Sequence, residues 1–123
     1  MKRVLVIEDN EDNMKVITFI LEKHSYHTIR AENGKRGIEL AELEKPDFII
    51  LDIQLPDIDG IVVLKEILSS KILGKIPIIA MTSHALVGDR EKMLNAGCNG
   101  YIEKPIDPVR IMSQIKKIVG EEP

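Results

Sequence analysis

Acidic side chains, one threonine and one lysine stand where apolar runs of this sequence end. Glu8 and Asp9 follow the first run, Asp52 and Thr82 close later ones, and Lys104 follows the last. A carboxylate buried without a partner costs several kcal/mol. Asp52, within FIILDIQLPDIDG, must therefore be paired, bound to a metal or emerging into solvent.

These residue types suit phosphoryl chemistry. Three carboxylates brought together repel one another unless a cation neutralises them, and an all-oxygen set suits octahedral Mg²⁺ that retains several waters. Lys104 could hold a phosphoryl oxygen, Thr82 could donate its hydroxyl to another, and Asp52 could attack phosphorus to give an acyl phosphate. Phosphoryl transfer requires little more from a protein than positioning of the reacting groups and neutralisation of their charge.

Five short segments read as strands. Residues 3–7, 48–51 and 76–81 are nearly continuous apolar runs, which is typical of parallel strands covered on both faces. Residues 26–31 alternate more and residues 100–103 form a short run, which suits edge strands.

Segments with helical spacing lie between these strands and after the last. Three carry clear apolar stripes: Val16, Ile17, Ile20 and Leu21; Leu64, Ile67 and Leu68; Ile111, Ile115, Ile118 and Val119. Two are weaker: residues 35–44, with Ile38, Ala41 and Leu43, and residues 86–96, with Leu86, Met93 and Leu94.

Turn and cap residues support this reading. Asp107 followed by Pro108 predicts a helix N-cap with proline at the first helical position, and Gly97 stands where a helix end needs a left-handed residue. The alternation predicts an α/β fold, a doubly wound parallel sheet of five strands with five helices. In such a sheet ligands bind at the carboxyl ends of the strands, where the polar residues stand.

Length and composition exclude several classes of function. The 123 residues predict one domain with no output domain, and 17 basic against 20 acidic side chains give no reason to bind nucleic acid or an anionic membrane. No apolar run reaches the ~20 residues of a membrane span, and no export signal precedes the first strand. A single cysteine, Cys98, fits a reducing compartment, so we expect a cytoplasmic protein.

Four motifs resemble the receiver domain of two-component response regulators: VIEDN at 6–10, LDIQLPDIDG at 51–60, AMTSHA at 80–85 and GYIEKPID at 100–107. The resemblance covers essentially the whole chain and is greatest to stand-alone receivers of the DivK and CheY kind. It implies a flavodoxin-like sheet of strand order 2-1-3-4-5.

The resemblance also implies a role for each site residue. Asp52 would accept a phosphoryl group, paired with Lys104. Glu8, Asp9 and Asp52 would bind Mg²⁺, or Mn²⁺ in its place, together with the backbone carbonyl of Gln54. Where this chain has Glu8 and Asp9, the family usually has two aspartates, and the longer side chain could reach the metal through water.

Further positions follow from the same resemblance. Thr82 and Tyr101 would act as the switch, and the peptide bond between Lys104 and Pro105 would be cis. Gln54 and His84 would tune the lifetime of the phosphoryl group, although His84 read by itself is equally a surface histidine.

The partners would be a sensor histidine kinase or a histidine phosphotransfer protein, and a downstream target protein. The chain would be a monomer that could dimerise when phosphorylated. One candidate contact surface contains Leu86, Val87, Tyr101 and Ile102. A second is an apolar ring of Met14, Pro105 and Ile106, although Met14 could equally be an isolated surface residue.

Two other functions share this layout. A Mg²⁺-dependent phosphatase with an aspartyl-phosphate intermediate typically has a general acid two residues after its nucleophile, where this chain has Gln54. A flavin-binding domain would need a phosphate-binding loop after the first strand, where EDNEDN would repel phosphate. Asp57 and Asp59 are assigned to the turn before Gly60, without a catalytic role.

Overall fold

The computed structural model describes residues 2–71, 73–83 and 89–120, and strands and helices alternate along them. The elements are β1 (Arg3–Ile7), α1 (Glu11–Lys23), β2 (His27–Ala31), α2 (Gly34–Glu44), β3 (Phe48–Asp52), α3 (Gly60–Ser69), β4 (Ile78–Thr82), α4 (Asp89–Asn95), β5 (Gly100–Glu103) and α5 (Ile111–Val119). No helix in these three ranges has both the length and the apolar character required to cross a membrane.

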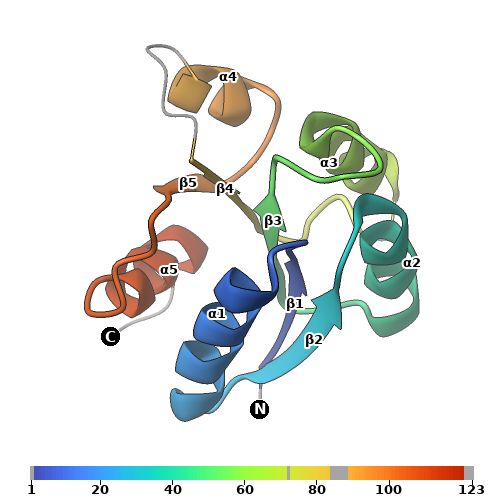
Figure 1. The fold of residues 1–123 in the computed structure, drawn as a ribbon. Helices are drawn as coiled ribbons and strands as arrows, with labels where there is room; N and C mark the ends of the chain where they lie inside the picture. Colours follow the sequence, from blue (N-terminus) through green and yellow to red (C-terminus); the bar gives the residue numbers. More distant parts are fainter. Residues whose placement is uncertain (1, 72, 84–88, 121–123) are drawn as a thin grey trace.

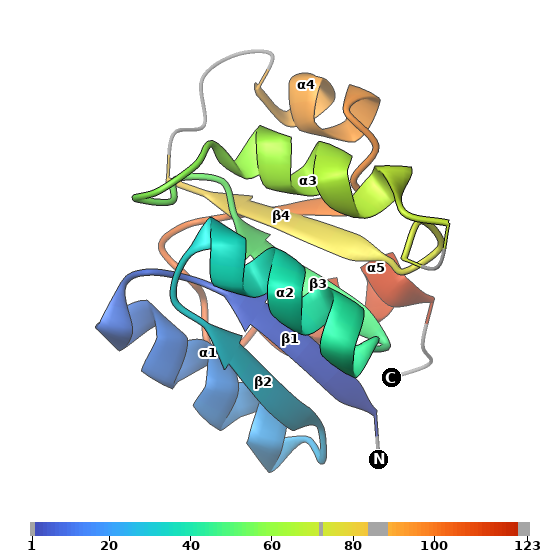
Figure 2. The same ribbon diagram turned by 90° about the vertical axis from the view of Figure 1, so that its right-hand side faces the viewer.

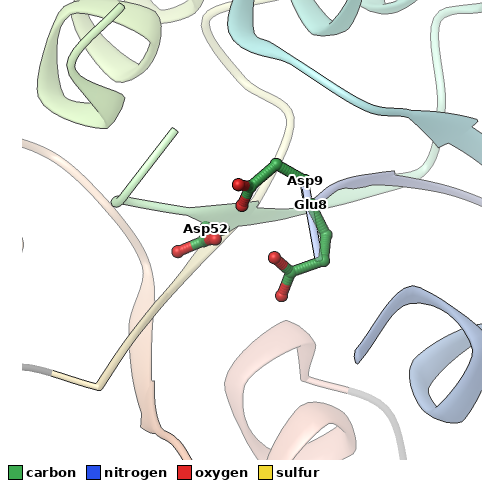
Figure 3. Close-up of side chains that lie close together, drawn as sticks. All are labelled: Glu8, Asp9 and Asp52. Carbon is green, nitrogen blue, oxygen red and sulfur yellow. The ribbon is translucent and has the colours of Figure 1, made fainter. Parts of the chain in front are cut away.

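The five strands form one parallel sheet in the order β2-β1-β3-β4-β5, which confirms the predicted topology. Figures 1 and 2 show the sheet between two layers of helices. Ile7 of β1 pairs with Leu51 of β3, and Asp52 pairs with Met81 of β4. The carboxyl ends of these strands therefore share one edge, where three acidic side chains meet (Figure 3).

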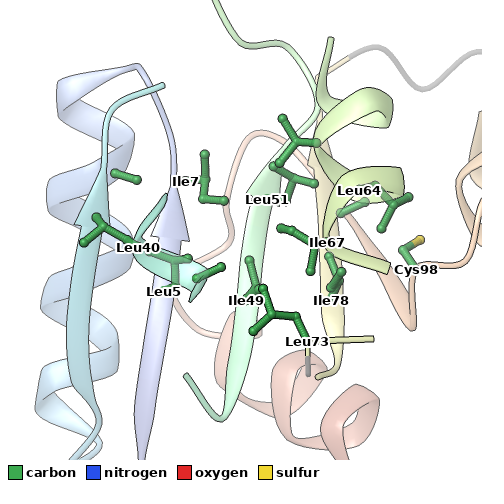
Figure 4. Packing of buried hydrophobic residues seen from close by; sticks show 14 of the residues in the cluster. Leu5, Ile7, Leu40, Ile49, Leu51, Leu64, Ile67, Leu73, Ile78 and Cys98 are labelled. Atoms are coloured by element: carbon green, nitrogen blue, oxygen red, sulfur yellow. The ribbon is translucent and has the colours of Figure 1, made fainter. Parts of the chain in front are cut away.

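One face of the sheet is covered by α2, α3 and α4. Strand residues such as Leu5, Ile49 and Ile78 pack there against Leu40 of α2 and Leu64 of α3 (Figure 4). These side chains are almost fully buried. Burying one leucine or isoleucine side chain contributes about 1.5–3 kcal/mol, so this cluster fixes the sheet that carries the acidic edge.

The opposite face is covered by α1 and α5, which lie on the same side of the sheet in Figure 1. Ile17 of α1 and Ile115 of α5 are buried against this face. The rings of Tyr26 and Phe48 meet edge to face with centroids 5.7 Å apart. Because both faces are apolar, the central strands read as continuous apolar runs in the sequence.

The prediction of the buried face of α1 was partly wrong, because the observed face is rotated about the helix axis by part of a turn. Val16 is 39% exposed, whereas Met14 and Thr18 are buried beside Ile17 and Leu21. The buried Thr18 hydroxyl donates to the Met14 carbonyl oxygen at 2.8 Å, so the polar residue is satisfied within the core face. Apolar spacing alone does not identify such a position.

Two further expectations need correction. Leu43 of α2 is 71% exposed, and Leu40 takes the buried position. Helix α5 begins at Ile111 rather than beside Pro108, because a separate turn comes first, in which the Asp107 side chain accepts a hydrogen bond from Val109. Gly97 does adopt a left-handed conformation after α4, with φ of 113°, as predicted.

Gly60, the first residue of α3, packs directly on the chain that follows β3. Its N–H donates to the Ile53 carbonyl at 3.0 Å, and a Cβ at this position would lie 2.7 Å from that oxygen. Such a distance is shorter than van der Waals contact, and the obstacle is backbone rather than a flexible side chain. The two segments can approach this closely because residue 60 has no side chain.

We therefore predict that Gly60→Ala lowers the free energy of unfolding by about 2 kcal/mol or more, although alanine is the better helix former. Urea denaturation monitored by circular dichroism measures this. Ser113→Ala, at an exposed position in α5, is the control and should stay within about 0.5 kcal/mol of wild type. A Gly60→Ala protein as stable as wild type would contradict the packing argument.

Candidate functional site

Three carboxylates converge where β1 and β3 end. Glu8 continues the line of β1, because its N–H donates to the Ala31 carbonyl of β2 at 3.0 Å. Asp9 follows it, and Asp52 is the last residue of β3. One carboxylate oxygen from each of the three lies within 4.8 Å of the others, as Figure 3 illustrates. Glu8 and Asp52 are buried and Asp9 is exposed, so solvent reaches the group from one side.

Lys104, which follows the edge strand β5, provides the compensating positive charge. Its Nζ lies 2.7 Å from Glu8 Oε1 and 3.2 Å from Asp52 Oδ2, and its side chain is 11% exposed. Its backbone N–H donates to the Thr82 carbonyl at 3.0 Å. Its peptide bond to Pro105 is cis, the isomer expected from the sequence. One ammonium group is thus shared by two buried carboxylates.

This environment changes the acidity of both partners. Burial, followed by the neighbouring Glu8 carboxyl, raises the pKa of Asp52 from 3.8 to about 6, although the Gln54 N–H and Lys104 act in the opposite direction. Burial of the Lys104 ammonium opposes protonation, but Glu8 and Asp52 outweigh it and raise the lysine pKa. The acids therefore compete for positive charge, as expected where a further cation can bind.

Gln54 lines the cleft that contains Asp9, Asp52 and Lys104. Its backbone N–H donates to Asp52 Oδ1 at 3.0 Å, and its side-chain Oε1 accepts from the Ser83 hydroxyl at 2.8 Å. These contacts place Gln54 beside the acids. Three converging carboxylates form the hard oxygen donor set that Mg²⁺ prefers, and one accessible side leaves room for its waters. The residues present therefore fit a magnesium ion.

The two predicted switch residues lie on neighbouring strands in different environments. Thr82 is the last residue of β4 and is 3% exposed. Tyr101 of β5 is half-buried, its hydroxyl oxygen is buried, and its ring packs against the cluster under α3 and α4. His84, Leu86 and Val87, also named from the sequence, lie outside the described residues.

The predicted contact surface is only partly exposed. Met14 is 6% exposed and belongs to the core between α1 and the sheet, so the prediction that it lies on the surface was wrong. Ile102 is buried too, because it points into the same core. Pro105 is exposed and Ile106 is half-buried. Sequence reasoning missed an exposed apolar patch, formed by Val16, Phe19, Ile20 and Pro108.

Asp57 has a partner that its local sequence does not indicate. Its carboxylate accepts hydrogen bonds from the Gly34 and Lys35 N–H groups at the start of α2, in addition to its interactions with the Ile58 and Asp57 N–H groups within the turn before Gly60. Asp59 does serve α3 locally: it is the N-cap, and its side chain accepts from the Ile61 N–H at 2.8 Å.

Comparison with known proteins agrees with this geometry. Residues 4–116 match the model of the response regulator receiver domain. The chain is 42% identical over 120 residues to the polar-differentiation response regulator DivK of Brucella anthropi and 41% identical to that of Brucella ovis, each alignment covering 98% of both chains.

Solved structures show the same fold. The receiver domain of a sensor histidine kinase from Pseudomonas aeruginosa has a TM-score of 0.88 at 33% identity, covers 98% of each chain and contains a magnesium ion in its active-site cleft. A putative response regulator from Chloroflexus aurantiacus has a TM-score of 0.91 at 24% identity, again over 98% of each chain. These matches agree with the acidic cleft and with Lys104 beside it. The chain therefore belongs to the receiver domain family of response regulators and resembles DivK.

Proposed function

We propose that this protein is a single-domain response regulator that accepts a phosphoryl group on Asp52 and signals through contacts that depend on phosphorylation. The observation that carries the proposal is the pairing of Asp52 with Lys104 inside a cluster of three acids, at the ligand-binding edge of the sheet. The alignment with the response regulator DivK over 98% of both chains supports the proposal.

In the proposed reaction, an Asp52 carboxylate oxygen attacks the phosphorus of a phosphohistidine. A P–O bond forms, the P–N bond breaks, and its electron pair returns to the imidazole nitrogen, which takes up a proton. Lys104 stands where its ammonium can neutralise charge on the transferred group. Hydrolysis reverses the modification: water attacks phosphorus, the bond to Asp52 breaks, and inorganic phosphate leaves.

A bound Mg²⁺, or Mn²⁺ in its place, would neutralise the charge that accumulates between the nucleophile and the phosphoryl oxygens. Glu8, Asp9, Asp52 and the Gln54 carbonyl would hold it. The magnesium ion in the related Pseudomonas receiver domain supports this assignment. Lys104 would then be available to the phosphoryl group, because the metal ion would share the neutralisation of the acids with its ammonium.

Phosphorylation would act as the switch through local electrostatics. The group adds roughly two negative charges and strong acceptor oxygens. Thr82 would donate its hydroxyl to one of these oxygens, and Tyr101 would change its packing with it. Gln54 and His84 would set how long the phosphoryl group survives.

The proposed donors are a sensor histidine kinase or a histidine phosphotransfer protein. Pro105, Ile106 and the apolar patch of Val16, Phe19, Ile20 and Pro108 offer a surface for a helix of the donor. A downstream target protein, or a second phosphorylated copy, would read the changed surface around Tyr101. The single cysteine, Cys98, supports placing these reactions in the cytoplasm.

The alternative of a phosphatase acting on outside substrates has less support. Gln54 carries no acidic proton, and its side-chain oxygen already accepts a hydrogen bond from Ser83. Self-dephosphorylation at a slow rate is the hydrolytic activity that we propose.

The first prediction concerns the phosphorylated residue. Incubation with phosphoramidate and Mg²⁺ should add one phosphoryl group to the wild-type protein and none to Asp52→Asn, because the amide is a far weaker nucleophile. Intact-protein mass spectrometry measures the adduct, with a chelator in place of Mg²⁺ as the control. Labelling of the variant at wild-type level would place the acceptor elsewhere, and a wild-type protein without any adduct would contradict the proposed function.

The second prediction uses the charge of Asp52 without any phosphodonor. Its pKa is about 6 in the folded protein and near 3.8 in the unfolded chain, so the unfolded state ionises first and stability falls as pH rises between these values. The amide introduced by Asp52→Asn cannot ionise, so the variant escapes this loss. In metal-free buffer, the stability gained by Asp52→Asn should therefore be about 1 to 2 kcal/mol larger at pH 7.5 than at pH 4.5.

Urea denaturation of both proteins at the two pH values tests this, with Asp12→Asn at an exposed position of α1 as the matched control. The control should change the free energy of unfolding by nearly the same small amount at both pH values. A gain for Asp52→Asn that does not change with pH would mean that Asp52 is not held in the environment described above.

A further inference from the structure

The loop of residues 53–59, here called the acid-site loop, carries Gln54 between β3 and α3. The Gly60 N–H donates to the Ile53 carbonyl and so ties the two ends of the loop together, and the Ile53 N–H donates to the Met81 carbonyl of β4, each at 3.0 Å. Between these ends Gln54, Pro56 and Asp57 are exposed, whereas Leu55 and Ile58 are half-buried against the core. Burial alone therefore does not hold the middle of the loop in place.

Asp57 attaches the middle of this loop to another helix. Its Oδ1 accepts from the Gly34 N–H at 2.8 Å and its Oδ2 from the Lys35 N–H at 3.0 Å, across 23 and 22 residues of sequence. Asn33, the N-cap of α2, accepts from the Arg36 N–H at 2.9 Å. The first three N–H groups of α2 are thus all satisfied, two of them by a residue from a distant loop.

Charge and packing both support this attachment. The Lys35 and Gly34 N–H groups lower the pKa of Asp57, so the carboxylate stays ionised at a helix N-terminus, where negative charge is favoured. Beside it Ile58 lies so close to α2 that a Cβ on Gly34 would be 2.5 Å from Ile58 Cγ1. The loop and the helix are therefore in direct contact at two successive residues.

We infer that Asp57 is a positioning residue for the acidic site: by fixing the acid-site loop to the N-terminus of α2, it holds Gln54 against Asp52. The inference rests on the proposed function, in which Gln54 contributes a metal ligand and Asp52 the nucleophile. Two residues, Leu55 and Pro56, separate Gln54 from Asp57, and the ring of Pro56 fixes one of their backbone angles. A segment this short and stiff transmits a displacement of Asp57 to Gln54.

The chain provides a matched control for a purely structural effect. Asp57→Ala and Asn33→Ala each remove side-chain acceptors from the same end of α2, but only Asp57 belongs to the acid-site loop. Both variants should lose stability, since each removes a side-chain acceptor from the N–H groups at the start of α2. If α2 itself mattered to the site, both variants would disturb the site alike. If Asp57 positions the loop, only the first will.

The first readout needs neither metal nor phosphate. Amide hydrogen exchange, followed by NMR on the metal-free proteins, reports the Gln54 N–H that donates to Asp52 Oδ1. In Asp57→Ala this amide should exchange about fivefold faster or more. In Asn33→Ala it should stay within about twofold of wild type, once both rates are corrected for global stability. Equal exchange in the two variants would overturn the inference.

The second readout is Mg²⁺ affinity, measured by isothermal titration calorimetry with the metal alone. Asp57→Ala should bind Mg²⁺ about tenfold more weakly, as is usual when a residue that orients a metal ligand is lost. Asn33→Ala should bind as wild type does. Asp57→Asn keeps one acceptor oxygen and should give an intermediate affinity, and it replaces Asp57→Ala in both measurements if the alanine variant does not fold.

The outcomes separate the two proposals. A wild-type protein that binds no Mg²⁺ and takes no phosphoryl group would contradict the proposed function, and the exchange of the Gln54 amide would still decide whether Asp57 positions the loop. A wild-type protein that does both, with Asp57→Ala and Asn33→Ala alike in exchange and affinity, would leave the proposed function standing and overturn the role of Asp57.

Discussion

The site depends on one ammonium group placed between two buried carboxylates. Removal of two negative charges from water costs several kcal/mol each, and only a close, well-directed cation offsets that cost. Lys104 comes from the end of β5, Glu8 from β1 and Asp52 from β3, so they meet only when the whole sheet has formed in its observed order. The two apolar layers that fix the sheet therefore also fix the charge balance of its edge.

This balance of charge among Glu8, Asp52 and Lys104 suggests how a change of charge at Asp52 could alter the structure at the surface. The Lys104 backbone N–H is bonded to the Thr82 carbonyl, so the backbone at Lys104 is joined to the end of β4. In a low-dielectric site, further negative charge on Asp52 would redistribute the interactions of Lys104 with both acids. Thr82 lies at the end of β4, and Tyr101 lies on the neighbouring strand β5. The residues nearest the charge are therefore connected to the strands that would carry the change outward.

The sequence was sufficient for the sheet and for the acidic edge because both follow from short-range rules. Apolar runs mark buried parallel strands, and polar residues that follow them must gather at one edge. The errors arose where partners lie far apart in sequence or where a polar residue satisfies itself locally. Thr18 can be buried because its hydroxyl donates to the Met14 carbonyl. The predicted buried face of α1 therefore omitted Thr18, and it also omitted the buried Met14. Asp57 finds its partners at residues 34 and 35, which no local pattern reveals.

Two different kinds of support thus hold the acidic site. Glu8, Asp52 and Lys104 are held by burial, which sets their charges and makes their geometry costly to change. Gln54 is exposed and is held by hydrogen bonds from its own N–H, from Ser83 and, through the acid-site loop, from α2. Hydrogen bonds near solvent are each worth about 1 kcal/mol and open far more readily than a core. The exposed side of the site is therefore where a bound group would alter the geometry at least cost, while the buried side keeps Asp52 in place.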